Sequence, residues 1–128
     1  MSKKKPVKKI LIIEDDALLL RVLSETFARE NFEIAMVENG LEAEKAAKDF
    51  SPDMILLDLV LPGLDGFAVL KNLKAGEVTK KIPVIILSNL EDVGDVKSTK
   101  VLGAEEYFIK ANTEVEKVVD YVKKRLKV

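Results

Sequence analysis

The sequence has no cysteine and no histidine among its 128 residues. The absence of cysteine excludes disulfides, thiolate metal sites and cysteine nucleophiles. The absence of histidine removes the commonest general base, the commonest zinc ligand and any phosphohistidine within the chain. Carboxylates, hydroxyls, lysines and backbone groups must therefore carry any chemistry that this chain performs.

A large net charge and long apolar runs are missing as well. Lysine and arginine (21) nearly balance aspartate and glutamate (22), so no global field points to nucleic acid or to a membrane surface. The lysine cluster at 3–5 precedes a short apolar run, 10–13, that is too short for the core of a signal peptide. No run approaches the roughly 20 residues of a membrane span. We expect a cytoplasmic protein with a solvated basic tail over residues 1–7.

The composition is typical of one globular domain. Apolar residues make up 48% of the chain and charged residues 34%, which is unlike a disordered chain. A chain of 128 residues is long enough to bury one hydrophobic core. We expect a single domain over residues 1–128, without an internal repeat or a linker.

Short apolar runs and longer amphipathic segments alternate along the chain. The short runs lie between turn-forming residues and predict strands, whereas the periodic segments between them predict helices. Such alternation is typical of an α/β protein with a parallel sheet covered by helices on both faces. The predicted strands are 8–13, 32–37, 54–57, 84–87 and 105–109, and the predicted helices are 17–29, 41–49, 66–74, 92–102 and a last one ending near 126.

Three positions carry patterns that predict the starts of helices. Asp16 and Asp65 stand directly before the first and third predicted helices, where a carboxylate can accept backbone N–H groups. Thr113, with Glu116 three residues later, has the pattern of a capping box before the last helix.

Polar side chains follow four of the predicted strands. Glu14 and Asp15 follow the first strand, Asp58 the third, Ser88 the fourth and Lys110 the fifth. Each residue alone could be a helix-start acid, a turn hydroxyl or a solvated lysine. The carboxyl ends of parallel strands share one edge, however, where open α/β sheets bind ligands, so these groups can converge.

The residue types in this group suit magnesium and phosphate. Carboxylates from two strands offer the oxygen ligands that Mg²⁺ takes in proteins. A cation at such a site allows a carboxylate to act as a nucleophile toward a phosphoryl group, because it offsets the charge repulsion. A lysine and a hydroxyl can then hold the phosphoryl oxygens.

The chain resembles a response-regulator receiver domain over residues 8–126. The resemblance rests on the motifs ILIIEDD, ENG with LEA after it, LLDLVLPGLDG, IPVIILS and LGAEEYFIK, taken in this order. The spacings from Asp15 to Asp58, Ser88 and Lys110 also agree with that family. The resemblance implies a flavodoxin-like, doubly wound, five-stranded parallel sheet in the order 2-1-3-4-5 with five helices.

The resemblance implies a metal site and a phosphorylation site. Asp58 would be the phosphoacceptor, and Lys110 would pair with an oxygen of the phosphoryl group. Glu14, Asp15 and Asp58, together with the backbone carbonyl of Val60, would hold Mg²⁺. The chain would catalyse its own phosphorylation and a slow self-dephosphorylation, and would otherwise not be an enzyme.

A switch and two kinds of partner are implied as well. Ser88 would bond the phosphoryl group and shift when it arrives, and Tyr107 would turn inward as Ser88 moves. The output face would be the fourth helix, the fifth strand and the fifth helix, about residues 92–126. A histidine kinase or a histidine phosphotransfer protein would donate the phosphoryl group. A protein partner or a second copy would bind the output face, without direct contact to nucleic acid or membrane.

Three features depart from the family pattern. Ala111 replaces the proline usual after the lysine, and since a cis bond before another residue costs roughly 3 kcal/mol, we expect a trans bond here. Asn89 is larger than the residue usual at its position, so it should narrow access to the acceptor. Val60 and Leu90 are apolar and cannot orient an attacking water, which predicts slow self-dephosphorylation.

Two other functions fit part of the pattern. A Mg²⁺-dependent phosphatase resembling the haloacid-dehalogenase group would need a second aspartate where Val60 stands. A receiver-like binding module without phosphorylation would agree with Ala111 and Asn89, but the complete set of strand-end groups disfavours it. The leading hypothesis is a phosphorylation-dependent switch that either stands alone or is part of a longer regulator.

Overall fold

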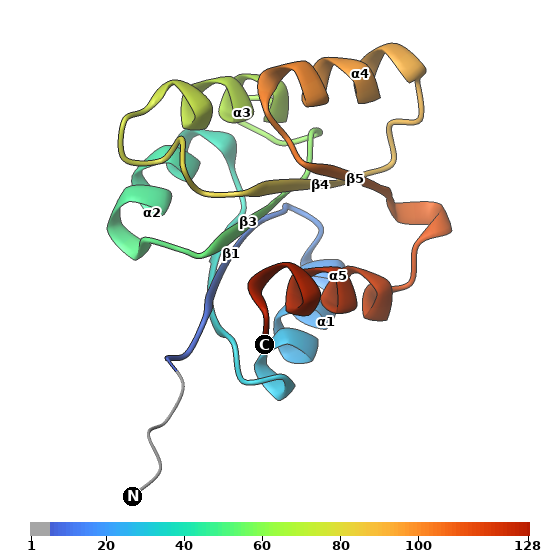
Figure 1. Cartoon of the computed structure of the whole chain (residues 1–128). Coiled ribbons are helices and arrows are strands. Elements are labelled where there is room, and N and C mark those ends of the chain that lie inside the picture. The colour runs from blue at the N-terminus through green and yellow to red at the C-terminus, as the bar shows by residue number, and fades with distance from the viewer. Residues whose placement is uncertain (1–5) are drawn as a thin grey trace, which may run out of the picture.

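The computed structural model describes residues 6–128, so the lysine cluster at 3–5 and most of the predicted basic tail lie outside the described residues. Strands and helices alternate along the described chain (Figure 1). The strands are β1 (Lys9–Ile13), β2 (Glu33–Val37), β3 (Met54–Leu57), β4 (Val84–Ser88) and β5 (Glu106–Ile109). The helices are α1 (Ala17–Arg29), α2 (Ala43–Phe50), α3 (Gly66–Ala75), α4 (Val93–Leu102) and α5 (Val115–Leu126), and two 3₁₀ turns are η1 (Gly40–Glu42) and η2 (Lys110–Asn112).

The five strands form one parallel sheet in the order β2-β1-β3-β4-β5. This confirms the predicted flavodoxin-like, doubly wound fold. Every residue of β3 and β4 is buried, which agrees with the unbroken apolar runs 54–57 and 84–87. Strands of a parallel sheet are covered on both faces, so they need apolar side chains on both sides.

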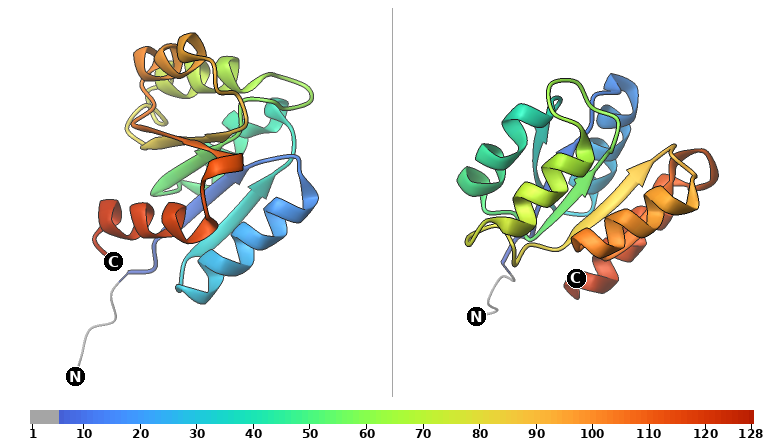
Figure 2. Two further views of the ribbon diagram at one scale, coloured as in Figure 1. Left: turned by 90° about the vertical axis from the view of Figure 1, so that its right-hand side faces the viewer. Right: turned by 90° about the horizontal axis from the view of Figure 1, so that it is seen from above.

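Helices cover both faces of the sheet (Figure 2). On one face α2 and α3 pack against the sheet, and Leu70 and Leu73 of α3 are fully buried there. On the other face α1 and α5 supply Phe27 and Val119 to a second hydrophobic core. Burial of each such side chain contributes about 1.5–3 kcal/mol, so these two cores hold the strand ends in place.

Two of the predicted helix caps are confirmed. The Asp16 carboxylate accepts the N–H of Leu19 at 3.1 Å, at the start of α1. The Asp65 carboxylate accepts the N–H of Ala68 at 3.1 Å, at the start of α3. Both acids satisfy N–H groups that have no partner inside their own helix.

The predicted capping box at Thr113 is wrong. Glu114 is the residue that precedes α5, and in the described chain its side chain makes no capping hydrogen bond. The turn η2 comes directly before, and Thr113 closes this turn by donating its N–H to the Lys110 carbonyl at 3.5 Å. Thr113 therefore ends one turn instead of starting the helix, and α5 begins one residue later than the pattern predicts.

Candidate functional site

The carboxyl ends of β1 and β3 bring two acids to one edge of the sheet. The N–H of Glu14 donates to the Val37 carbonyl at 2.9 Å, and the N–H of Asp58 donates to the Ile13 carbonyl at 3.0 Å. These bonds continue the sheet pairing and fix the backbone of both acids. Both residues are buried, with exposed fractions of 2% for Glu14 and 5% for Asp58.

Lys110, the first residue after β5, joins these two carboxylates. Its Nζ lies 2.8 Å from Glu14 Oε1 and 2.8 Å from Asp58 Oδ2. The lysine side chain is 16% exposed, so all three charged groups are largely removed from water. Buried charges of this kind are tolerated when they are paired, and the lysine pairs with both acids at once.

The surroundings shift the pKa values of two of these groups. Burial raises the pKa of Glu14 above 4.5, although the bonds from Lys110 and from the Asp16 N–H oppose it. Burial also disfavours the charged form of Lys110, but its bonds to Asp58 and Glu14 outweigh burial and raise the lysine pKa above 10.5. Lys110 is therefore an ammonium group throughout the physiological pH range.

The acids form a cluster that suits a hard cation. One carboxylate oxygen from each of Glu14, Asp15 and Asp58 lies within 4.8 Å of the others. When all three carboxylates are ionised, their negative charge exceeds the positive charge of the Lys110 ammonium by two. Carboxylate oxygens are the ligands that Mg²⁺ prefers, so the donor set and its excess negative charge both fit this ion.

An open hollow leads to this cluster. Its lining includes the predicted ligands Asp15, Asp58 and Val60, and also Asn89 and Lys110. Val60 is 59% exposed at the rim, and its N–H donates to Asp58 Oδ1 at 3.2 Å. A small phosphoryl donor can therefore approach the Asp58 carboxylate from solvent.

Ser88, which directly precedes Asn89, is joined to Tyr107 through the backbone of Leu90. Ser88 is fully buried, and its Oγ accepts the N–H of Leu90 at 3.4 Å. The Tyr107 hydroxyl donates to the Leu90 carbonyl at 2.6 Å. Burial raises the pKa of Tyr107, while the nearby Ser88 side chain opposes the rise. The sequence gives no sign of this connection, because a backbone group has the same chemistry at every residue.

Asn89 and Ala111, which both depart from the family pattern, contact each other. The N–H of Ala111 donates to Asn89 Oδ1 at 3.0 Å. No peptide bond within residues 6–128 is cis, so the bond between Lys110 and Ala111 is trans, as expected.

Within residues 6–128, no helix is long and apolar enough to cross a bilayer.

Comparison with known proteins agrees with this geometry. The family model for the response regulator receiver domain matches residues 10–123. Sporulation initiation phosphotransferase F of Bacillus subtilis is 34% identical over 119 residues, which are 93% of this chain and 94% of that protein. The DNA-binding response regulator MtrA of Mycobacterium tuberculosis is 34% identical over 103 residues, which are 80% of this chain but 44% of MtrA.

A solved structure of a response regulator has a similar fold. The phosphorylated cyanobacterial phytochrome response regulator RcpA superimposes with a TM-score of 0.80 at 30% identity, over 93% of this chain and 91% of that one. The fold, the acids and lysine at the sheet edge, and the family match over residues 10–123 agree with one another. The chain belongs to the response regulator receiver domain family.

Proposed function

We propose that this chain is a signalling switch that accepts a phosphoryl group on Asp58. The observation that carries the proposal is the environment of that carboxylate. Asp58 is 95% buried at the end of β3 yet lines an open hollow, with the Lys110 ammonium 2.8 Å from its Oδ2. Burying an acid is costly, and this buried acid nevertheless lines a hollow that is open to solvent.

The reaction is a phosphoryl transfer from a phosphohistidine of a histidine kinase or a histidine phosphotransfer protein. A carboxylate oxygen of Asp58 attacks the phosphorus, so that a P–O bond forms while the P–N bond breaks. The imidazole leaves with the electron pair and takes up a proton from solvent. Lys110, already an ammonium, balances charge at the acceptor and then pairs with an oxygen of the transferred group.

Glu14, Asp15 and Asp58, with the backbone carbonyl of Val60, are the proposed ligands of Mg²⁺. The ion supplies positive charge that offsets the repulsion between the phosphoryl oxygens and the attacking carboxylate. Two observations support this assignment: the carboxylate oxygens lie within 4.8 Å of one another, and Val60 stands at the rim of the same hollow.

The proposed switch runs through Leu90. When Ser88 turns its hydroxyl toward the phosphoryl group, the Leu90 N–H loses its acceptor, and the Leu90 carbonyl that holds Tyr107 is free to move. Tyr107 then turns inward. Two nearly balanced arrangements biased by a new local charge are a common basis for such switches.

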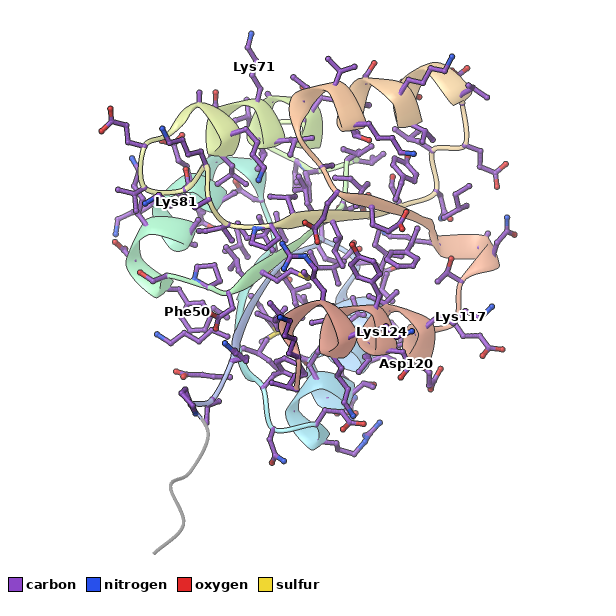
Figure 3. The ribbon with its side chains drawn as sticks, in the orientation of Figure 1. Phe50, Lys71, Lys81, Lys117, Asp120 and Lys124 are labelled. Atoms are coloured by element: carbon purple, nitrogen blue, oxygen red, sulfur yellow. The ribbon has the colours of Figure 1, made fainter. Side chains whose placement is uncertain are left out.

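The proposed output face comprises α4, β5 and α5. Within α4, which the structure describes in full, Thr99 is the one buried residue, so few core contacts oppose a shift of this helix. Figure 3 shows Lys117, Asp120 and Lys124 on α5, where they are exposed and add charge of both signs to this side of the molecule. A protein partner or a second copy would bind this face.

Self-dephosphorylation is proposed to be slow. Val60 is exposed at the rim of the hollow and cannot orient an attacking water. Val60→Asn, which adds a polar group at the same place, should shorten the half-life of the phosphorylated chain several-fold. Equal decay of the native and variant proteins, followed by intact mass, would contradict this explanation.

The test of the proposed function is intact mass after incubation with acetyl phosphate and Mg²⁺, with Asp58→Asn as the matched control. We expect one phosphoryl adduct that requires Mg²⁺ and is absent from the variant. If a folded protein gives no adduct with acetyl phosphate or with a phosphorylated kinase, the chain is a receiver-like binding module instead. An adduct that persists in Asp58→Asn would place the acceptor at another residue.

A further inference from the structure

Asn89 and Ala111 form a hydrogen bond across the two loops that carry the phosphoryl-binding residues. The paired ladder of β4 and β5 ends at Ser88 and Ile109, and beyond it the Ala111 N–H donates to Asn89 Oδ1 at 3.0 Å. A backbone N–H only donates, so the atom facing it must be the side-chain oxygen of Asn89. The bond therefore links the residue after Ser88 to the residue after Lys110.

Apart from the ion pairs that the Lys110 side chain itself makes with Glu14 and Asp58, the backbone of the turn η2 has few contacts to hold it. It is three residues long, none of its residues is buried, and no side chain within residues 6–128 caps its start. Its closing backbone bond, from the Thr113 N–H to the Lys110 carbonyl, is long at 3.5 Å. The 3.0 Å bond from Ala111 to Asn89 is thus the better-formed of these two backbone tethers of the turn.

We propose that Asn89 is a positioning residue for Lys110. By holding the Ala111 amide, Asn89 fixes the turn η2 and so keeps the lysine ammonium 2.8 Å from the Asp58 carboxylate. A lysine side chain has a long flexible stem, so a fixed backbone at its base reduces the number of positions that the ammonium can reach. The kinetic consequence rests on the function proposed above, whereas the structural consequence does not.

The competing explanation is that Asn89 merely narrows the hollow, whose lining it joins. The two explanations differ for Asn89→Leu, which keeps the size of the side chain and removes the acceptor oxygen. A steric wall would be unchanged by this substitution, whereas a positioning residue would be lost. Asn89→Asp retains an acceptor oxygen and serves as the matched control for the hydrogen bond itself.

The first measurement needs no phosphorylation. In the metal-free protein, hydrogen exchange at the Ala111 amide should become about threefold to tenfold faster in Asn89→Leu, as expected for loss of one hydrogen bond, and stay near native in Asn89→Asp. The side-chain order of Lys110, measured by NMR relaxation, should fall in Asn89→Leu. Unchanged exchange at Ala111 or unchanged order at Lys110 would overturn the proposal, and thermal unfolding checks that both variants fold.

The second measurement is the rate of phosphorylation by acetyl phosphate with saturating Mg²⁺. Asn89→Leu should lower the rate about threefold to tenfold in the native background. It should have no effect in a Lys110→Met background, because no ammonium is left to position. An equal loss in both backgrounds, or no loss in the native one, would overturn the proposal. If the native protein forms no adduct at all, the proposed function fails, and the NMR measurements still decide the role of Asn89.

Discussion

Replacing Lys110 by methionine should destabilise the metal-free protein and make its stability depend strongly on magnesium. Methionine keeps the length of the side chain but removes the ammonium that lies 2.8 Å from both Glu14 and Asp58. Two buried carboxylates then face each other, with Asp15 close by and no cation between them.

The size of the effect follows from these distances. Each contact of unit charges at 2.8 Å is worth about 6 kcal/mol at an effective dielectric constant of 20, before the cost of removing the ammonium from water is subtracted. Removal of one partner from a buried ion pair typically costs about 3–5 kcal/mol. Lys110 is partly exposed, and Glu14 can take up a proton, so we expect about 2–4 kcal/mol at neutral pH.

The dependence on pH has a definite sign. The folded state raises the pKa of Glu14 above 4.5, chiefly through burial, so the protonated form favours folding and this contribution is lost as the pH rises through the folded value. Removal of Lys110 deletes a contact that lowers this pKa, which moves it further upward. The difference in stability between native and variant should therefore shrink as the pH falls from about 7 to about 5.

Denaturant unfolding with and without Mg²⁺ tests this reasoning. A ligand at 100 times its Kd adds about 2.7 kcal/mol to the stability of the state that binds it. At the proposed site Mg²⁺ would place positive charge among the same acids that Lys110 contacts, so the variant should bind Mg²⁺ more tightly and gain more stability from it than the native protein. Equal stability without metal, or equal gains on adding Mg²⁺, would refute the electrostatic account of this site.

Three further predictions concern the scaffold. Burial and, next, the Glu105 carboxylate raise the pKa of Tyr121 to about 12, so Glu105→Gln should lower its midpoint in an absorbance titration; an unchanged midpoint would assign the shift to burial alone. Gly66→Ala should cost at least about 2 kcal/mol in denaturant unfolding, because a Cβ at Gly66 would clash with the main chain at the end of β3; native-like stability would show that this segment can move. Asp65→Ala should cost about 1 kcal/mol and Thr113→Ala less than about 0.5 kcal/mol, since only the first accepts a helix N–H; equal losses would restore the capping box.

Much of the fold could be predicted because its determinants are local. The segments 54–57 and 84–87 are unbroken apolar runs between turn formers, and strands that are covered on both faces of a parallel sheet need such sequences. The meeting of Glu14, Asp58 and Lys110 follows from parallel strands alone, because each residue is the first after its strand. The sequence did not predict that all three side chains are largely removed from water or that Lys110 contacts both acids, because both features depend on how the elements pack.

The features of the fold and of the site that were predicted wrongly or not at all also have physical explanations. The capping pattern at Thr113 is present in the sequence, but the preceding residues form a 3₁₀ turn that uses Thr113 as its end. A local pattern cannot decide between two turns that compete for one residue. The link from Ser88 to Tyr107 through Leu90 was not predictable, because it uses backbone atoms whose positions depend on the path of the loop after β4.

Asn89 and Ala111 show the limit of reasoning one position at a time. Considered separately, each departs from the family pattern and each suggests an impaired site. In the structure they are partners, because alanine retains the N–H that a proline would lack, and asparagine supplies the oxygen that accepts it. Twenty-two residues separate the two positions, so neither substitution predicts the other from the sequence. If the bond positions Lys110 as proposed, the Asn89 side chain holds a turn that a proline ring would stiffen covalently. Unlike a ring, this hydrogen bond can open when the loop after Ser88 moves.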